Sequence, residues 1–410
     1  MSLTLAIISE SRKDDSRTPL TPNQVKYLLK KFSNLKIVVE PSKNRCFSEK
    51  DYLKAGSIIK TDISEADIIL GVKEVNIKKL IANKTYLFFS HTIKMNKNNL
   101  EGTQGTPGVE KKELLREIIK KNITLIDYEN IRDNSGNGYR YLGFGRFAGI
   151  VGCYNTINLH FKMEGKKMLP RAFELNSYDK LKEIISNQKF KKFKIIITGD
   201  GRVAKGSLEF FKFTNIKQVS PEDYLNKTHS EAVFCNLKTH DYVERNDNKL
   251  FSLKDFILNP HQYKSKIKKY LLETNMLIAS HYWDPLSPKL FSINQIKEFK
   301  NLKIIGDITC DINGSIPTTI RSTSIKEPYY SIDINSMQEN NFNDNTLAVM
   351  AVDNLPSELP KDSSEEFGDA LVSDVLPYII NNDDGRIKKA TIVNKGKLTV
   401  PFIYLKDFIN

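Results

Sequence analysis

Short apolar runs alternate with amphipathic segments over the first 130 residues. Runs rich in apolar and β-branched residues predict buried strands at residues 5–8, 35–40, 66–75, 85–94 and 123–131. The segments between them carry apolar residues at helical spacing, at residues 21–32, 47–56 and 111–122. This alternation predicts a parallel sheet with helices on its faces. In such a sheet, functional side chains lie at the carboxyl ends of the strands.

Local signals mark the ends of several predicted helices. Thr21, followed by Pro22, predicts the start of the first helix. Ser48 predicts the start of the second helix, and Gly56 predicts its end. Ser363 has a glutamate three residues later, the spacing of a capping box. It precedes an amphipathic stretch, 365–382, that we expect to return to the first sheet.

The same strand–helix pattern resumes later in the chain. An apolar, glycine-punctuated segment at 139–162 predicts a helix that crosses between two domains, and residues 165–193 are mostly helical in pattern. Strands are predicted at 195–198, 216–219, 232–237, 276–282, 303–309 and 347–353, and irregular structure at 313–319 and 326–333. The fold class is therefore α/β, with two parallel sheets.

A glycine-rich turn connects the first strand and helix of this second series. Gly199, Gly201 and Ala204 stand at the spacing G-x-G-x-x-A. Gly199 allows a tight turn, Gly201 lets the backbone approach a pyrophosphate, and Ala204 lets helix and strand pack closely. The N-terminus of the helix favours an anion through its free N–H groups. The turn predicts a dinucleotide site, with an ordinary strand–turn–helix connection as the alternative.

Composition and charge restrict the class of protein. The 410 residues include 62 lysines and arginines against 49 acids, a formal charge of +13. The lysines are scattered and form no tract with aromatics, which argues for a basic surface or a field that attracts polycarboxylates rather than for nucleic-acid binding. No apolar run reaches the roughly 18 residues that span a bilayer, and the N-terminal segment fits a first strand better than a signal peptide. Four separated cysteines predict reduced thiols and a cytoplasmic protein.

Side chains with acid–base chemistry fall at the predicted strand ends. They are Lys73 and Glu74, His91 and Glu129. A histidine with a pKa near neutrality suits proton transfer. A lysine suits it only if burial and neighbouring cations lower its pKa. Each residue alone is an ordinary exposed side chain, but their occurrence together, ahead of a dinucleotide turn, favours an active site.

Motifs along nearly the whole chain resemble one enzyme family. In order, they are ISESRKDDSRTPLTP, GVKEV, FFSHTIK, LIDYENI, GFGRFAG, GDGRVAKG, GDITCDINGSIP and AVDNLPSELP. The chain is similar to lysine-forming saccharopine dehydrogenases, in particular to their lysine–2-oxoglutarate reductase branch, which groups with alanine dehydrogenase and the transhydrogenase nucleotide domains. GVKEV and FFSHTIK are far more specific than the glycine turn.

The resemblance implies an NAD(P)-dependent oxidoreductase that interconverts saccharopine with L-lysine and 2-oxoglutarate. It also implies two Rossmann-like domains with the active site in the interdomain cleft. The substrate domain would be discontinuous, with residues 1–142 and 350–410. Residues 143–349 would form the dinucleotide-binding domain.

The resemblance further implies roles for individual residues. Lys73 and His91 are the implied acid–base pair. The implied substrate-binding residues are Arg17, Lys94, Glu129, Arg140 and Asp353. The predicted cofactor-binding residues are Gly199, Gly201, Arg202, Val203, Ala204, Ser220, Asp353, Asn354 and Leu355. Saccharopine bears three carboxylates, so three cationic contacts are chemically reasonable.

The cofactor is NAD or NADP. An NAD-preferring fold carries an acid about twenty residues beyond the first glycine, where this chain has Val219 and Ser220. Glu222 and Asp223 come slightly late, and no arginine adjoins Ser220 to favour a 2′-phosphate. The choice between the two cofactors stays open.

Four further polar residues have a structural interpretation beside a functional one. His281 is a candidate for the cleft wall, and His240 a weaker one. Asp307 and Asp311 resemble a pair of metal ligands, but no histidine accompanies them in the local sequence. We interpret them as turn and supporting acids and predict no metal site.

Two other functions stay open. One is an alanine dehydrogenase-like amino-acid dehydrogenase, although Arg17, Lys94 and Arg140 offer more anion contacts than pyruvate needs. The other is a non-catalytic nucleotide-binding regulatory protein, against which the complete lysine–histidine pair argues. The predicted partners are small-molecule substrates, with neither nucleic acid nor membrane. The oligomeric state and the physiological direction are left open.

Overall fold

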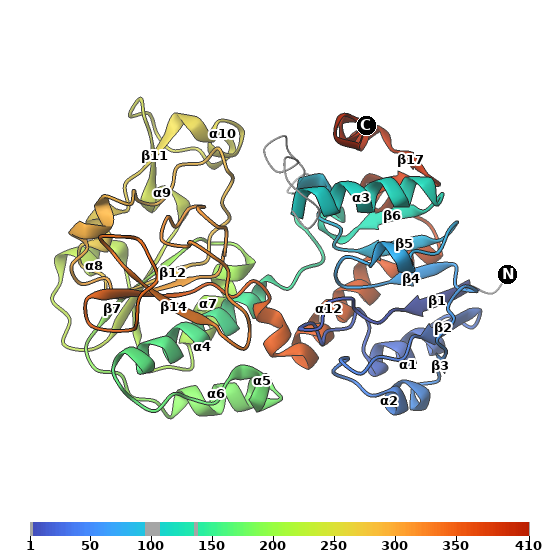
Figure 1. Ribbon diagram of the computed structural model, residues 1–410, viewed down its shortest axis with the longest axis horizontal. Helices are drawn as coiled ribbons and strands as arrows, with labels where there is room; N and C mark the ends of the chain where they lie inside the picture. Colours follow the sequence, from blue (N-terminus) through green and yellow to red (C-terminus); the bar gives the residue numbers. More distant parts are fainter. Residues whose placement is uncertain (1–2, 95–106, 135–137, 410) are drawn as a thin grey trace. The chain divides into compact units, whose positions relative to one another are not determined.

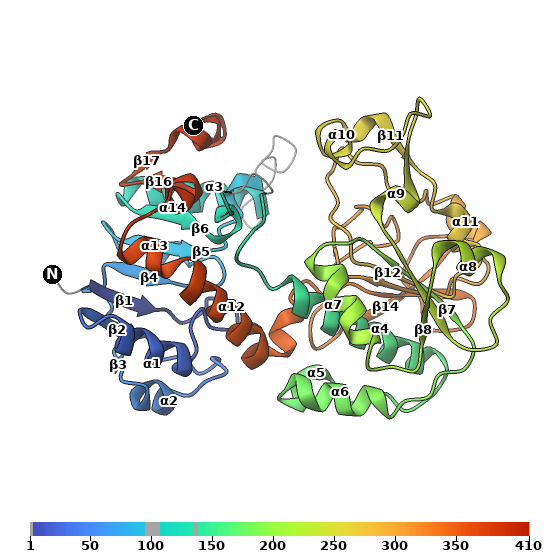
Figure 2. The same ribbon diagram turned by 180° about the vertical axis from the view of Figure 1, so that it is seen from behind.

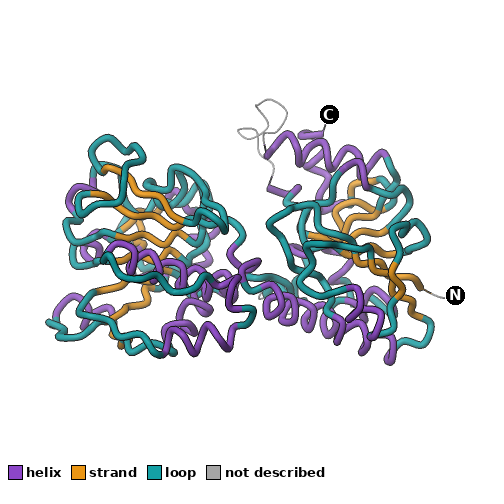
Figure 3. Tube along the Cα trace, turned by 60° about the horizontal axis from the view of Figure 1, so that its bottom comes forward, coloured by secondary structure: helices purple, strands orange, loops and turns teal. Residues whose placement is uncertain are grey.

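The computed structural model describes residues 3–94, 107–134 and 138–409. Its chain divides into two compact units. The first is discontinuous and consists of Met1–Gly143 and Pro360–Asn410, and the second is Phe144–Leu359. Within each unit the strands lie between layers of helices (Figure 3). From the sequence, the second boundary was expected earlier, between residues 349 and 350.

The first unit is built on an eight-stranded sheet (Figure 1). In sheet order the strands are β17 (Lys397–Leu398), β16 (Thr391–Asn394), β6 (Thr124–Asp127), β5 (Thr85–Phe88), β4 (Ile68–Leu70), β1 (Leu3–Ile7), β2 (Leu35–Val39) and β3 (Ile58–Ile59). The strands from β6 to β3 are parallel, and Ile7 pairs with Val39 on one side and Leu70 on the other. The parallel α/β prediction is confirmed. The antiparallel β16 and β17 were not predicted, because both are short and polar at one end.

Helices cover both faces of this sheet. α3 (Pro107–Lys120) buries Leu114, Leu115 and Ile118 against one face, beside η8 (Val400–Leu405) and α15 (Lys406–Ile409). Figure 2 shows α1 (Pro22–Lys31), α13 (Leu376–Ile380) and α14 (Arg386–Ala390) on the other face. The remaining elements are α2 (Glu49–Lys54), η1 (Ile77–Lys79), η2 (Thr92–Lys94), η4 (Tyr128–Asn130) and α12 (Pro360–Asp374).

Two of the three predicted helix starts are confirmed. At the start of α1, the Thr21 N–H donates to Gln24 Oε1. At the start of α2, the Asp51 N–H donates to Ser48 Oγ. The prediction for Ser363 is wrong. α12 begins at Pro360, so Ser363 lies inside the first turn of the helix. Proline is well suited to the first helical position, because the N–H that it lacks would have no helical partner there.

The second unit carries a seven-stranded sheet. In sheet order the strands are β14 (Tyr329–Asp333), β15 (Thr346–Met350), β13 (Ile304–Asp307), β12 (Met276–Ala279), β7 (Lys194–Thr198), β9 (Val233–Leu237) and β8 (Lys217–Val219). All neighbours are parallel except β14, which is antiparallel to β15. β14 corrects the irregular structure expected at 326–333. Ile195 and Ile197 enter the core on one face of the sheet and Ile196 enters the core on the other.

The helix that follows the glycine turn packs closely against a second helix. α4 (Gly145–Met163) packs against α7 (Arg202–Phe211), the helix that follows the turn. A Cβ atom at Gly206 would lie 2.0 Å from the carbonyl oxygen of Arg146, and one at Gly149 would lie 2.1 Å from that of Val203. Only glycine therefore permits this approach at both positions. Residues 350–359 belong to this unit because η7 (Leu355–Glu358), which follows β15, packs on α4.

Short helices complete the second unit on both faces of the sheet. They are α5 (Ala172–Leu175), α6 (Tyr178–Ser186), α8 (Pro221–Asn226), α9 (Thr239–Tyr242), α10 (Leu253–Leu258), η5 (Pro260–Gln262), α11 (Lys268–Leu271) and η6 (Gln295–Glu298). α4, α5, α6 and α7 contribute to one core cluster, and α8, α9, α11 and η6 contribute to the other.

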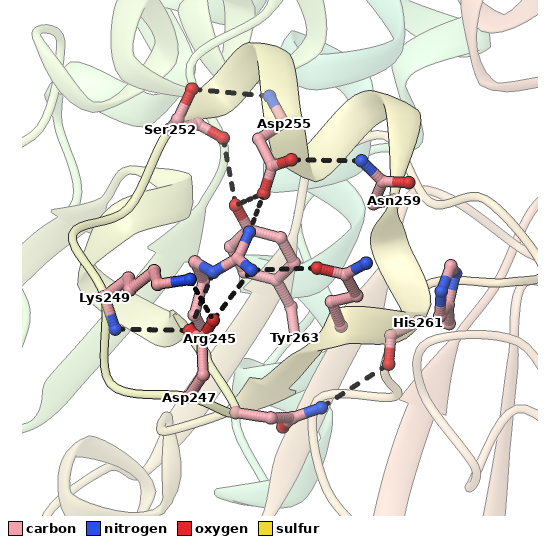
Figure 4. A network of polar contacts seen from close by, with 10 residues as sticks. Arg245, Asp247, Lys249, Ser252, Asp255, Asn259, His261 and Tyr263 are labelled. Atoms are coloured by element: carbon pink, nitrogen blue, oxygen red, sulfur yellow. Dashed lines mark hydrogen bonds and ion pairs between the residues drawn. The ribbon is translucent and has the colours of Figure 1, made fainter.

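An excursion between β9 and β12 forms a separate hairpin. β10 (Val243–Arg245) pairs antiparallel with β11 (Tyr263–Ser265), and α10 lies in the connection. Arg245 donates to Asp247 at 2.8 Å and contacts Asp255, which also accepts from the Tyr263 hydroxyl at 2.6 Å (Figure 4). Charged groups thus hold the connection in place. This hairpin was not predicted from the sequence.

Candidate functional site

Four neighbouring strands of the first unit end at one edge of the sheet, in the order β6, β5, β4 and β1. Glu10 follows β1, Lys73 and Glu74 follow β4, His91 follows β5, and Glu129 follows β6. Because these strands are parallel, their carboxyl ends meet along the same edge. The structure therefore brings together residues that are more than a hundred positions apart in the chain.

Lys73 is half-buried, and its backbone is fixed by an acid. The N–H groups of Val72 and Lys73 donate to the two carboxylate oxygens of Glu10, at 2.7 and 2.9 Å. Burial, followed by the charge of Arg17, lowers the pKa of the Lys73 ammonium. Among the residues that the structure describes, none makes an ion pair or hydrogen bond with that ammonium. This is the environment that an acid–base lysine requires.

His91 is oriented by the acid of the neighbouring strand end. Its Nδ1 lies 2.5 Å from Oε1 of Glu74, and its ring stacks on Phe89 with an interplanar angle of 20°. Burial raises the pKa of Glu74, but the hydrogen bond and charge of His91 outweigh it and bring the value to about 2. The backbone of His91 has φ of +53°, in the left-handed region. Such a conformation in a residue other than glycine costs about 1–3 kcal/mol, so its surroundings must impose it.

Both arginines predicted to bind substrate carboxylates are paired with acids. Arg17 donates through Nε and Nη2 to the two oxygens of Asp15, at 2.9 and 2.5 Å, and both residues are at least 97% buried. Burial raises the pKa of Asp15, but Arg17 outweighs it and brings the value to about 2. Arg140 donates to Oε1 of Glu129 at 2.9 Å and is about one-third exposed. The side chain of Lys94 lies outside the described residues.

Three buried or half-buried acids of this edge were missed by the sequence analysis. They are Glu10, Asp15 and Asp127. Asp127 ends β6 and accepts from the N–H groups of Ser90 and Glu129, at 2.9 and 2.7 Å. An acid at the last position of an apolar strand was a usable signal for Asp127. No pattern in SESRKDDSR separates Glu10 and Asp15 from the other acid of that loop.

In the second unit, the glycine turn has the conformation that its sequence predicts. Gly199 has φ of +101°, and a Cβ there would lie 2.8 Å from the Cα of His281. Gly201 caps α7, and no atom lies within 4 Å of the position of its missing Cβ. Ala204 is fully buried under the turn. The open side of Gly201 and the N-terminus of α7 together fit a dinucleotide pyrophosphate.

Other predicted cofactor residues have mixed environments. Ser220 Oγ accepts the Asp223 N–H at 3.0 Å and caps α8, which occupies the hydroxyl as an acceptor. Asp353 is exposed at the end of β15, and Asn354 is buried beside it. Leu355 is buried in the core against α4, so only its backbone is available to a cofactor. Arg202 and Val203 are half-buried in the first turn of α7.

His281, His240, Asp307 and Asp311, for which a structural role was considered beside a functional one, differ in burial. His281 is about nine-tenths buried, and its Nδ1 lies 2.7 Å from Thr198 Oγ1. Burial lowers its pKa to about 4. His240 is largely exposed. Asp307 accepts from the hydroxyls of two threonines, both at 2.6 Å, which confirms its interpretation as a turn acid; Asp311 is exposed in the following turn.

The described part of the chain contains neither a cluster of metal-ligating side chains nor a helix suited to cross a membrane. No group of three histidine, cysteine or acidic side chains is suitably arranged for a metal ion. None of the helices in that part is long and apolar enough to cross a membrane.

Comparison with known proteins gives matches over most of the chain. Models described as "Alanine dehydrogenase/PNT, N-terminal domain" and "Alanine dehydrogenase/PNT, C-terminal domain" match residues 6–150 and 235–401. "Alpha-aminoadipic semialdehyde synthase, mitochondrial" of Mus musculus is 27% identical over 444 residues, covering 96% of this chain. The chain spans less than half of that relative, 46%. "Saccharopine dehydrogenase [NAD(+), L-lysine-forming]" of Candida glabrata is 27% identical, and the match covers 92% of this chain and 91% of the relative.

A solved structure supports the fold. That of an L-alanine dehydrogenase matches with a TM-score of 0.63 and 13% identity, and all of both chains is covered. At this identity the likeness concerns the fold alone.

Proposed function

Because the chain belongs to the alanine dehydrogenase/PNT family, we propose that it is a pyridine-nucleotide-dependent dehydrogenase of amino-acid substrates that interconverts saccharopine with L-lysine and 2-oxoglutarate. The relative from Candida glabrata, whose name is that of a lysine-forming saccharopine dehydrogenase, supports this reaction. The observation that carries the proposal is the proximity of a lysine of lowered pKa to a histidine oriented by Glu74, at neighbouring strand ends.

Lys73 and His91 divide the proton transfers in this proposal. Formation and hydrolysis of an imine require repeated proton transfers at a nitrogen and at a carbinol oxygen. Glu74 engages Nδ1 of His91, so Nε2 is the nitrogen that we assign to the substrate. The lowered pKa of Lys73 makes its neutral amine available nearer to neutral pH.

The cations of this edge take separate roles. Arg17 is buried against Asp15, so we assign it chiefly to the electrostatics of Lys73, whose pKa it lowers. Arg140 is one-third exposed and donates to Glu129, and we propose it as a contact for a substrate carboxylate because a guanidinium can bind a carboxylate through two parallel N–H groups. Lys94, on η2, is the further proposed carboxylate contact.

The cofactor is assigned to the second unit. Gly199, Gly201 and the start of α7 would hold its pyrophosphate, and Asp353 and Asn354 would lie beside its reactive end. When bound, the nicotinamide supplies or accepts the hydride of the reaction. We propose NAD or NADP without preference, because neither an acid nor an arginine stands at the end of β8.

The test is oxidation of NADH and of NADPH by the purified protein with two substrate pairs. Lysine with 2-oxoglutarate is expected to support turnover, and ammonia with pyruvate is not. Turnover with the second pair alone would make the protein an alanine dehydrogenase-like enzyme. Cofactor binding without turnover in either pair would leave a non-catalytic nucleotide-binding protein.

A further inference from the structure

Hydrogen bonds between buried polar groups fix the loop that carries His91. Ser90 and Thr92 flank His91, and both are completely buried. The Ser90 hydroxyl lies 2.9 Å from that of Thr92, and the Thr92 N–H donates to Ser90 Oγ at 3.3 Å. These bonds close a tight turn around His91, the residue with left-handed backbone.

A single acid anchors this turn. Asp127 is fully buried at the end of β6. Its Oδ2 accepts from the N–H of Ser90 at 2.9 Å and also from the Ser90 hydroxyl. Its Oδ1 accepts from the N–H of Glu129 at 2.7 Å. One carboxylate therefore fixes the ends of both β5 and β6.

The two carboxylate oxygens of Asp127 meet three donors, all of them from the two turns that carry His91 and Glu129. An ionised carboxylate accepts at both oxygens, whereas an amide can accept at only one. In Asp127→Asn, the N–H₂ group of the amide would therefore face an N–H donor of Ser90 or of Glu129. The arrangement depends on the carboxylate itself.

We propose that Asp127 is a positioning residue, which with Ser90 and Thr92 imposes the left-handed backbone that presents the His91 imidazole to substrate. That His91 is presented to a substrate rests on the proposed function. The effect of Asp127 on the backbone of His91 rests on the geometry alone. The hydrogen bonds of Asp127 go to Ser90 and Glu129 and not to His91, so Asp127 acts through the flanking residue. Glu74 then fixes the ring that this backbone presents.

The proposal is tested with Ser90→Ala and Asp127→Asn in the full chain. Ser57→Ala is the matched control, because Ser57 is a buried serine of the same unit whose hydroxyl donates to a backbone carbonyl at 2.7 Å. Kinetics with lysine and 2-oxoglutarate, NADH affinity and melting temperature are measured for each. We expect kcat to fall about 10- to 100-fold in Ser90→Ala and Asp127→Asn, with NADH affinity unchanged within about twofold. Ser57→Ala is expected to lower the melting temperature and to leave kcat unchanged.

The second readout is the NMR signal of the His91 imidazole, identified among the six histidines by its loss in His91→Gln. The signal is expected to move in Ser90→Ala and to stay in place in Ser57→Ala. Equal losses of stability in both variants, with kcat and the His91 signal unchanged, would overturn the proposal. If Asp127→Asn does not fold, Ser90→Ala and Thr92→Val decide.

The NMR readout also separates this proposal from the proposed function. If the unaltered protein shows no turnover with lysine and 2-oxoglutarate, the proposed function fails and kcat is no longer informative. A His91 signal that moves in Ser90→Ala and not in Ser57→Ala then still supports the positioning role, and a signal that moves in neither still refutes it.

Discussion

The imidazole of His91 and the carboxylate of Glu74 form a hydrogen bond between the ends of two neighbouring strands, β5 and β4. Glu74 directly follows Lys73, so the acid that orients the histidine is covalently next to the lysine. A shift of either strand end would change both residues together. The positions of the two residues of the proposed acid–base pair therefore depend on each other.

Replacing Glu74 by glutamine is expected to lower kcat about 10- to 100-fold, because the ring loses the charged partner that orients it. Steady-state kinetics with lysine and 2-oxoglutarate measure the effect. Glu65→Gln is the matched control, since Glu65 forms an exposed ion pair with Lys60. Equal effects of the two substitutions would contradict the orienting role.

Lys73→Met is expected to remove most turnover and to leave cofactor affinity unchanged. The substitution removes a half-buried cation whose charged form burial disfavours, so the melting temperature should not fall. Turnover, NADH affinity and melting temperature are measured on the same preparation. Unchanged turnover would exclude Lys73 from the mechanism, and lost cofactor binding would point to a wider structural defect.

The sequence was most informative where regular spacing meets a strand end. Lys73, His91 and Glu129 were recognisable because each lies within three residues of the end of an apolar strand. The glycine turn was recognisable because φ above zero and close backbone approach both demand glycine, as at Gly199. The parallel order of the strands then brings these positions together without further information.

The partners of these residues were harder to predict. Arg17 was expected to face substrate, but it forms a buried pair with Asp15, two positions away in the same loop. Which of three acids in that loop it selects depends on the path of the loop, which spacing does not encode. The same holds for Glu10, whose bonds to Val72 and Lys73 cross sixty residues of chain.

Glu10→Gln is expected to change how stability depends on pH. Burial, followed by the charge of Asp15, raises the pKa of Glu10 from 4.5 to about 7. Between these values the folded state binds more protons than the unfolded state, so the contribution of Glu10 to stability falls as pH rises. Glutamine has no such dependence. As pH rises from 4.5 to 7, the difference in stability should therefore shift in favour of the variant, by at most about 3 kcal/mol, on top of a pH-independent loss from the oxygen that the amide replaces.

Hydrogen exchange of β4 measures this change within the first unit, after correction for the intrinsic exchange rate at each pH. Glu65→Gln serves again as control, because an exposed acid should produce little change. A difference between Glu10→Gln and the unaltered protein that stays constant from pH 4.5 to 7 would show that the Glu10 carboxyl is not destabilised by burial.

Two glycines of the second unit separate packing from cofactor binding. Gly206→Ala places a Cβ 2.0 Å from the carbonyl oxygen of Arg146 and should destabilise the unit by about 1–3 kcal/mol or more. Gly201→Ala meets no atom within 4 Å and has ordinary φ, so it should change stability by less than about 1 kcal/mol.

Gly201→Ala should nevertheless weaken NADH binding about 10-fold, because the new methyl group lies where the pyrophosphate would approach the backbone. Melting curves and fluorescence titration with NADH separate the two effects. A Gly201→Ala variant that is stable and binds NADH normally would mean that the cofactor phosphates do not lie on this turn. A Gly206→Ala variant as stable as the unaltered protein would mean that α4 and α7 can separate without cost, which their glycine contacts argue against.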